Sequence, residues 1–218
     1  MKLAALFFDF DGVILESGNI KTQAMCALFA EEAPADVDAI VDLHLRYGGV
    51  SRYRKFDMIY ADILHRPLSA KRRAELGERF REEVFGAVLR CPEIAGARDL
   101  LAAYREKLPL YVVSGTPEDE LREIVCHRSL ESFFAEVHGA PRSKSEIVRD
   151  VLKRHGHSPR QCVFVGDAPT DLETARECDL YFLGVVAPGT RSPFPDETRT
   201  VPDLTGLEQT LHSAGFEL

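Results

Sequence analysis

The chain has 218 residues, enough for one large domain or for a core domain with a smaller insertion. Its formal net charge of −8 argues against a general surface for nucleic acids or anionic membranes, although a bound metal ion can still attract an anionic substrate. The five cysteines are scattered without a CxxC pair, which indicates reduced thiols in a cytoplasmic protein. Asp9 interrupts the apolar N-terminal run, and no later stretch is long enough to span a membrane.

Two acids directly follow the first predicted strand. Residues 3–8 are apolar throughout, which is typical of a buried strand in a parallel sheet. Asp9 and Asp11 come next, and Gly12 lets the backbone turn away from the strand end, where such sheets bind ligands. Like charges this close repel unless a cation lies between them, and Mg²⁺ prefers oxygen ligands. This stretch predicts a magnesium-dependent catalytic site; the alternative is a turn with solvated acids.

A helical pattern occupies residues 16–87. Apolar residues recur there at helical spacing in four sets, which are separated by Pro34, by Gly48 with Gly49, and by Pro67 with Ser69. The pattern predicts no strand in this span. We therefore expect a helical cap domain over residues 16–87, inserted into a catalytic core that comprises residues 1–15 and 88–218.

From about Cys91 the pattern alternates between strands and helices, which predicts an α/β fold with a parallel sheet. Thr116 is expected to be the N-cap of a helix that starts at Pro117, and Ser143 starts a stretch with the spacing of a capping box. Residues 188–202 are rich in proline and polar residues, so we expect a surface loop there. The predicted strands are 110–113, 133–138, 162–165 and 180–186, and the predicted helices are 94–106, 117–126, 144–155, 169–177 and 204–212.

Polar residues follow the predicted strands of the core. Right-handed crossovers bring the carboxyl ends of parallel strands to one rim of the sheet, so residues far apart in the sequence should converge there. Lys144, at the start of a helix, should lie among them. The expected set is Asp9, Asp11, Ser114, Thr116, Lys144, Asp167 and Asp171.

The acids of this set suit phosphoryl transfer. A carboxylate beside a metal ion can attack phosphorus, as in aspartyl-phosphate enzymes, and Asp9 suits that nucleophile. Asp11 suits a general acid and base, which protonates the leaving oxygen and then activates water. Asp167 suits a metal ligand, and Asp171, four residues further on, could hold the same ion directly or through water.

Ser114 and Lys144 suit the binding of a phosphoryl group. The Ser114 hydroxyl and the backbone N–H groups of Gly115 and Thr116 could bind phosphate oxygens, and Lys144 would supply a positive charge. Taken alone, a serine at a strand end is typical of a turn, and a lysine in the first turn of a helix is typically solvated. The two later acids could likewise only cap a helix. The combination of these residues favours the functional interpretation.

These motifs resemble those of the haloacid dehalogenase superfamily of phosphohydrolases. The four motifs are Phe8–Val13, Val112–Thr116, Lys144 and Gly166–Asp171, and their order and spacing match across nearly the whole chain. The resemblance implies a Rossmann-like core, dependence on Mg²⁺, an aspartyl-phosphate intermediate, and metal binding by Asp9, the Asp11 carbonyl and Asp167. An acid at the position of Asp11 is typical of the branches that act on phosphate esters.

The predicted cap contains a further motif. Residues 48–52 are similar to the substrate-specificity loop of members resembling β-phosphoglucomutase, in which an arginine meets a second anionic group of the substrate. Arg52 could have that role, with Lys55 nearby; alternatively, Gly49 ends one helix, Ser51 caps the next and Arg52 is solvated. Lys21 stands where the mutases usually have histidine, and it either contacts the substrate or is an exposed helix lysine.

The resemblance predicts a Mg²⁺-dependent phosphatase that hydrolyses a small phosphorylated metabolite, such as a sugar phosphate or a phosphoglycolate-like compound. The alternatives are a phosphomutase of the β-phosphoglucomutase type and a non-catalytic phospho-acceptor module. We expect a cytoplasmic monomer or weak homodimer whose partner is a small phosphoester, with neither nucleic acid nor membrane as a partner.

Overall fold

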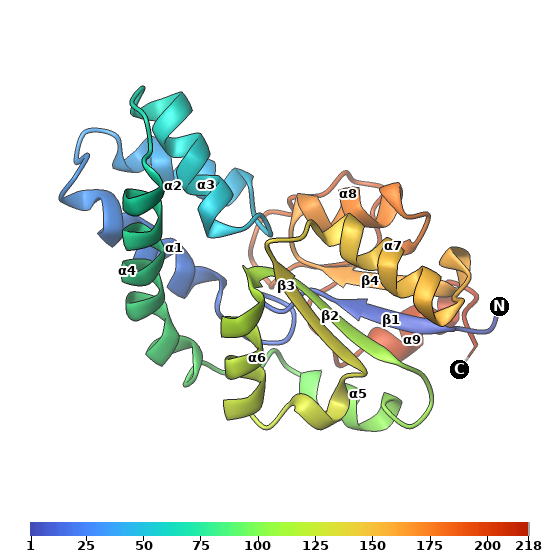
Figure 1. Cartoon of the computed structure of the whole chain (residues 1–218). Helices are drawn as coiled ribbons and strands as arrows, with labels where there is room; N and C mark the ends of the chain where they lie inside the picture. Colours follow the sequence, from blue (N-terminus) through green and yellow to red (C-terminus); the bar gives the residue numbers. More distant parts are fainter. Residues whose placement is uncertain (218) are drawn as a thin grey trace.

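The computed structural model describes residues 1–217. A parallel sheet of six strands forms its centre, in the Rossmann-like order β3-β2-β1-β4-β5-β6, of which Figure 1 labels the first four strands. The first strand of the chain lies in the middle, so the order of the strands reverses between β1 and β4. The strands are β1 (Ala5–Phe8), β2 (Leu110–Pro117), β3 (Glu136–Ala140), β4 (Cys162–Gly166), β5 (Tyr181–Val185) and β6 (Thr200–Val201).

Helices cover both faces of this sheet because its central strands are apolar on both sides. Successive residues of a strand point to opposite faces, so Phe7 packs in one hydrophobic cluster and Phe8 in another. The Phe7 cluster contains residues of α7 and α8, and the Phe8 cluster contains residues of α5, α6 and α9. These helices are α5 (Ala97–Tyr104), α6 (Glu118–His127), α7 (Lys144–His155), α8 (Pro169–Glu177) and α9 (Leu207–Ser213).

Four further helices are inserted between β1 and β2 and lie beyond the end of the sheet (Figure 1). Phe29, Phe56 and Phe80 hold them together, with ring centroids 6.2 and 6.4 Å apart. The loop before α3 reaches back to the first turn of α8, where Thr170 Oγ1 donates a hydrogen bond of 2.6 Å to the Gly48 carbonyl. The inserted helices are α1 (Gly18–Ala30), α2 (Val37–Arg46), α3 (Arg52–Met58), which continues into a π-helical turn (Ile59–Ile63), and α4 (Ala70–Val88).

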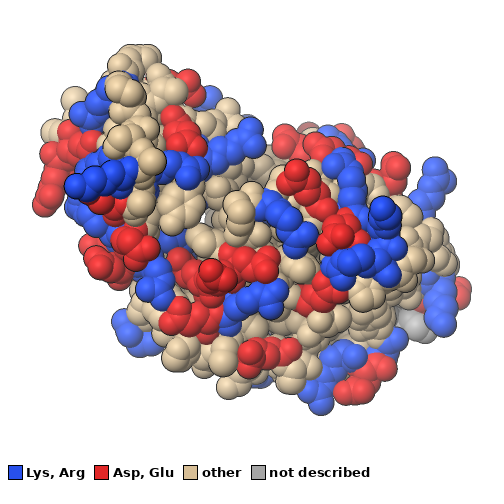
Figure 2. Space-filling model, viewed as in Figure 1, with Lys and Arg blue, Asp and Glu red and all other residues tan. Residues whose placement is uncertain are grey.

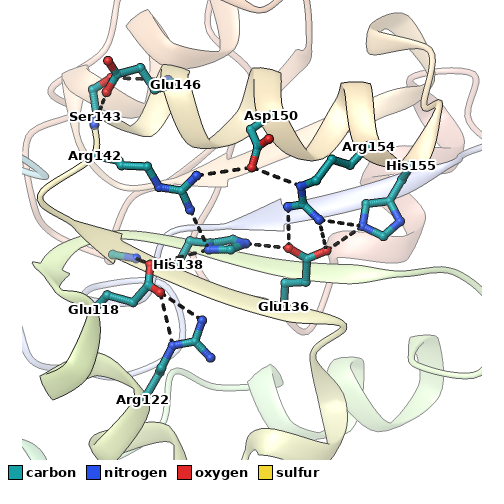
Figure 3. A network of polar contacts seen from close by, with 11 residues as sticks. Glu118, Arg122, Glu136, His138, Arg142, Ser143, Glu146, Asp150, Arg154 and His155 are labelled. Atoms are coloured by element: carbon teal, nitrogen blue, oxygen red, sulfur yellow. Dashed lines mark hydrogen bonds and ion pairs between the residues drawn. The ribbon is translucent and has the colours of Figure 1, made fainter.

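A network of charged residues fixes α7 on β3 (Figure 3). Glu136, on β3, accepts hydrogen bonds of 2.6 and 2.8 Å from Arg154, on α7. His138 lies 2.6 Å from Glu136 and 3.0 Å from Arg142, which in turn pairs with Asp150 at 3.2 Å. Because these contacts connect the strand with the last turn of the helix and with Arg142, just before the helix starts, they help to hold the first residue of α7 in place. That residue is Lys144.

The predicted α/β class, the parallel sheet and the helical insertion after the first strand are confirmed. The predicted capping box is also present: Ser143 Oγ accepts from the Glu146 N–H at 3.3 Å, and the Glu146 carboxylate accepts from the Ser143 N–H at 2.8 Å. The division into a core and a cap domain with the expected boundaries stays a prediction. In residues 1–217 no helix is both long and apolar enough to cross a membrane.

Three local predictions were wrong. Thr116 is not an N-cap, because β2 continues to Pro117, which itself precedes the first residue of α6. The predicted strand over 133–138 starts only at Glu136, after a 3₁₀ turn. The loop over 188–202 includes the short edge strand β6, which pairs with β5. In the first and last cases a neighbouring strand supplies hydrogen bonds that local sequence does not reveal.

Candidate active site

The ends of β1 and β4 place two of the predicted acids side by side. The Asp9 N–H donates to the Val165 carbonyl at 2.9 Å, which continues the pairing of β1 with β4. Asp9 therefore lies next to the Gly166–Asp167 turn. This is the point at which the strand order reverses, where open parallel sheets bind ligands.

Lys144 lies between two carboxylates at this point. Its Nζ is 3.0 Å from Asp9 Oδ2 and 2.6 Å from Asp171 Oδ1, and all three side chains are buried. Asp171 Oδ2 accepts the Ala168 N–H at 3.1 Å, so both oxygens of Asp171 have donors. Burial opposes the charge of Lys144, but the two carboxylates outweigh it and raise the pKa of the ammonium group. The interpretation of Lys144 as a solvated lysine is wrong.

Asp9, Asp167 and Asp171 form an acidic cluster, with one oxygen from each lying within 4.8 Å of the others. Burial raises the pKa of Asp9 to about 7, and Lys144 offsets only part of that shift. Burial, followed by the charge of Asp9, also raises the pKa of Asp167 well above its ordinary value. A divalent cation would remove this repulsion, so the cluster fits a metal ion with oxygen ligands.

Gly12 makes room for the Asp167 carboxylate. Its φ of +78° favours glycine, and a Cβ at this position would collide with the Asp167 side chain. The turn that the sequence predicted after Asp11 therefore has a second purpose. It lets the Asp167 carboxylate of the fourth motif lie directly against the backbone of the first motif.

Asp11 lies in a different electrostatic environment. Burial by itself would raise its pKa, but the charge and hydrogen bond of Lys21 outweigh burial and lower it to about 2. Ser17 Oγ and Thr116 Oγ1 also donate to this carboxylate, at 2.6 and 2.9 Å. The Lys21 side chain is only 14% exposed, since it contacts both Asp11 and Thr116. The interpretation of Lys21 as an exposed helix lysine is therefore wrong.

The second motif lies in the irregular last part of β2, against the loop before α3. Ser114 is buried, and its Oγ accepts the Thr116 N–H at 3.1 Å. A Cβ on Gly115 would collide with the Gly49 carbonyl of the loop before α3. The absence of a side chain at Gly115 is thus what lets this loop contact the core beside the acids.

Arg52 and Lys55 come from α3. Ser51 caps this helix, as the sequence suggested, but Arg52 is not solvated: its guanidinium donates to Glu120 of α6 at 2.6 Å. Both groups are 5% exposed, and Arg52 also lies over the ring of Phe80, 4.7 Å from its centroid. Lys55 Nζ lies 3.0 Å from the His44 carbonyl oxygen and 3.2 Å from His44 Nδ1.

Sequence reasoning missed Ser17, His44, Glu120 and Thr170. Ser17 precedes α1, where a serine usually caps the helix; here its hydroxyl contacts Asp11 instead. His44 lies on the apolar side of α2, where a histidine usually belongs to the core. Glu120, in the first turn of α6, has the sequence signature of an ordinary acidic N-terminus. Only Thr170 carried a signal, since it lies within the fourth motif.

A cavity of about 1420 Å³ lies between the sheet edge and the inserted helices. Its wall includes eight of the eleven predicted site residues, which come from separate parts of the chain. The other three, Ser114, Lys144 and Asp171, lie behind that wall. The cavity therefore has one wall from the core, which we call the core wall, and one from the inserted helices, which we call the helical wall. The predicted residues in the cavity wall are Asp9, Asp11, Lys21, Arg52, Lys55, Gly115, Thr116 and Asp167.

Comparisons with known proteins agree with this fold. The phosphoglycolate phosphatase of Synechococcus elongatus is 25% identical over 186 residues, which cover 84% of each chain. A hydrolase from Pseudomonas syringae has the same fold, with a TM-score of 0.78 at 17% identity over 96% of this chain and 98% of that one. The HAD-hydrolase YfnB from Bacillus subtilis, solved bound to magnesium, has a TM-score of 0.70 at 18% identity over 97% and 100% of the two chains.

The family-level comparison covers most of the chain. The profile of haloacid dehalogenase-like hydrolases matches residues 3–179, a span that includes all four motifs and the inserted helices. Together with the fold and the acids at the ends of β1 and β4, this match shows that the chain belongs to the haloacid dehalogenase-like hydrolase family.

Proposed function

We propose that this protein is a phosphatase that hydrolyses a small phosphate monoester through a phosphorylated Asp9. One observation carries the proposal: the Asp9 carboxylate lies at the end of β1, beside Lys144 and the acidic cluster, and faces the cavity. A phosphoryl group there would meet a nucleophile, a fixed positive charge and a metal-binding set of acids. The likeness to a phosphoglycolate phosphatase supports this proposal.

In the first step, an oxygen of Asp9 attacks phosphorus and the bond between phosphorus and the ester oxygen breaks. Asp11 gives a proton to the departing alcohol. In the second step, Asp11 takes a proton from water as the water oxygen attacks the phosphorus of phospho-Asp9. The acyl-phosphate bond then breaks, which releases inorganic phosphate and regenerates the Asp9 carboxylate.

The environment of Asp11 favours the second step. Lys21 and the two hydroxyl donors hold Asp11 in its ionised form, which is the form that removes a proton from water. The first step needs the same carboxyl group in its protonated form, which the contact with Lys21 disfavours. Lys21 therefore influences the proton transfers of both steps, and it replaces the histidine that the mutases usually have at this position.

We further propose that Asp9, the Asp11 carbonyl and Asp167 hold Mg²⁺, with Asp171 close enough to act directly or through water. The bound cation would neutralise the charge of the phosphoryl oxygens. The acidic cluster supports this assignment, as does the magnesium bound to YfnB. Since both oxygens of Asp171 already accept hydrogen bonds, its firmest role is to orient Lys144.

The remaining predicted residues belong to substrate binding in this proposal. Gly115 and Thr116 would contact the phosphoryl group, whereas Lys21, Arg52 and Lys55 face the rest of the substrate from the inserted helices. We assign residues 16–87 to a cap domain, residues 1–15 and 88–218 to the core, and the protein to a monomer or weak homodimer. All five cysteines are free, which supports a reducing compartment such as the cytoplasm.

The test is release of inorganic phosphate from a panel of phosphate monoesters, with Mg²⁺ and with EDTA. We expect turnover of sugar phosphates or phosphoglycolate-like compounds with Mg²⁺ and none with EDTA. The same reactions are analysed for isomerised sugar phosphates. Isomerisation without phosphate release would replace the phosphatase by a phosphomutase, and a stable phosphoprotein without turnover would indicate a phospho-acceptor module.

A further inference from the structure

The buried basic residues in the cavity wall differ in their partners. Lys21 contacts the Asp11 carboxylate, and Arg52 is paired with Glu120. Lys55 is also buried, at 5% exposed, but among residues 1–217 it has no carboxylate within ion-pair distance. Among residues 1–217, it is the one buried basic residue of the cavity wall without a carboxylate partner.

The contacts of Lys55 leave one of its donors free. An ammonium group has three N–H donors, and two are directed at His44: one at its carbonyl oxygen and one at Nδ1. Burial and the nearby lysines lower the pKa of His44 to about 3, so its ring is neutral and Nδ1 can accept. His44 thereby holds the lysine in one position, while the third N–H has no partner in the described chain.

A buried cation without an opposite charge is costly, and proteins usually pair such groups. Arg90 and Arg191 also line the cavity, but both are exposed, so water screens their charges. An anionic group entering the cavity would find its strongest unsatisfied partner at Lys55. A ligand that supplies this anion would stabilise the site more than a neutral ligand of the same shape.

We propose that Lys55 binds a second anionic group of the substrate, so that the preferred substrates are phosphate monoesters that also carry a carboxylate or another phosphate. This inference rests on the proposed phosphatase function, because it assumes that the first phosphoryl group lies at Asp9. Arg52 has a different role: since Glu120 neutralises it, Arg52 joins the inserted helix α3 to α6 of the core. Lys55 is therefore the specificity-determining residue, and His44 positions it.

The experiment compares matched pairs of esters. 3-Phosphoglycerate and glycerol 3-phosphate differ only by a carboxylate in place of a hydroxymethyl group, and fructose 1,6-bisphosphate and fructose 6-phosphate differ by one phosphate. Within each pair we call the ester with the second anionic group the anionic member and the ester with the phosphate alone the neutral member. For the wild type, kcat/KM should be higher for the anionic member of at least one pair. In Lys55→Met that preference should fall by roughly 10- to 100-fold, because kcat/KM decreases by that much more for the anionic member than for the neutral member.

Calorimetry on the catalytically inactive background separates recognition from turnover. Binding of the same esters is measured with Asp9→Asn and with Asp9→Asn/Lys55→Met, in the presence of Mg²⁺. We expect Lys55→Met to weaken the binding of only the anionic member of the preferred pair. Binding that shows this pattern in a protein without phosphatase activity would contradict the proposed function and still support the role of Lys55.

Controls make a negative result decisive. Lys71→Met removes an exposed lysine whose side chain is 89% accessible, so it should alter neither preference. Turnover of the neutral esters by Lys55→Met shows that this variant is folded. A wild type that does not distinguish the members of either pair, or a Lys55→Met effect of equal size on both members, would overturn the proposal. A preference confined to one pair identifies the anion as carboxylate or phosphate.

Discussion

The basic residues on the two sides of the cavity differ in whether a carboxylate neutralises them. On the core side, Lys144 lies behind the cavity wall and is shared between Asp9 and Asp171, so its positive charge is already paired when a substrate arrives. On the wall formed by α3, Arg52 is paired but Lys55 is not. Paired groups give a rigid, preorganised site for chemistry, whereas an unpaired group makes binding depend on the charge that the ligand supplies. The face of the molecule shown in Figure 2 has acidic and basic side chains intermixed, so this separation does not extend over that face.

Removing the proposed nucleophile should cause the largest loss of activity. We expect Asp9→Asn to lower kcat by roughly 10⁴-fold or more, because no phosphoenzyme can form. Phosphate release in a single-turnover assay measures this loss, and circular dichroism checks the fold. Asp99→Asn, which makes the same chemical change at an exposed position of α5, is the matched control. Activity of Asp9→Asn near that of the wild type would exclude Asp9 as the nucleophile.

Metal binding should stabilise the folded protein because it relieves the repulsion in the acidic cluster. At about 100 times its Kd, Mg²⁺ should raise the free energy of unfolding by about 2.7 kcal/mol. Thermal unfolding with Mg²⁺ and with EDTA measures this gain without any substrate. Asp167→Asn should abolish most of the Mg²⁺-dependent shift, whereas Asp99→Asn should leave it intact. A shift that is unchanged in Asp167→Asn would place the cation elsewhere.

The pairing of Arg52 with Glu120 can be broken from either side. Glu120→Ala leaves the Arg52 guanidinium buried without its partner, which should lower the free energy of unfolding by about 3–5 kcal/mol in urea titrations. Glu123→Ala removes an exposed partner of Arg81 and should cost less than about 1 kcal/mol.

The double variant Arg52→Met/Glu120→Ala then tests whether the two charges are coupled. It should recover much of the stability lost in Glu120→Ala, because the buried charge without a partner is gone. Arg52→Met is measured alone as well. If the effects of the two single variants simply add, the contact between Arg52 and Glu120 does not contribute to the stability of the protein.

The pH dependence of specificity offers the smallest but most selective test. Burial and the charge of Lys21 lower the pKa of Lys55 to about 7; Lys144 acts in the same direction, and Asp11 and Asp167 oppose them. His44, with its pKa of about 3, stays neutral over this range. Lys55 is therefore charged below about pH 7 and loses its charge above it.

The measured quantity is the kcat/KM of the anionic ester divided by that of its neutral partner. Taking this ratio cancels titrations that affect both esters equally. We expect it to be highest below about pH 7 and to fall, by up to about tenfold, as the pH rises through 7. In Lys55→Met the ratio should not change with pH. A constant ratio in the wild type would show that Lys55 does not contact the second anion in its charged form.

Local sequence determined much of this protein. Apolar runs and helical spacing predicted the sheet, the helices of the insertion and the capping box at Ser143, because these depend on residues close together in the chain. The acids after β1 and β4 were also predictable, since parallel strands carry their carboxyl ends to one rim. The sequence motifs alone therefore predicted which acids would meet at this rim of the sheet.

Only the tertiary structure decided the partners of the basic residues in the helical wall. Lys21 meets Thr116 across 95 positions, and Arg52 meets Glu120 across 68, after the inserted helices have packed on the core. No periodicity links such residues, and their types are those of ordinary solvated helix surfaces. Burial and pairing are properties of the packed interface, so the sequence could only suggest Arg52 and Lys55 as equivalent candidates for substrate binding. The structure separated them, because one has a carboxylate beside it and the other does not.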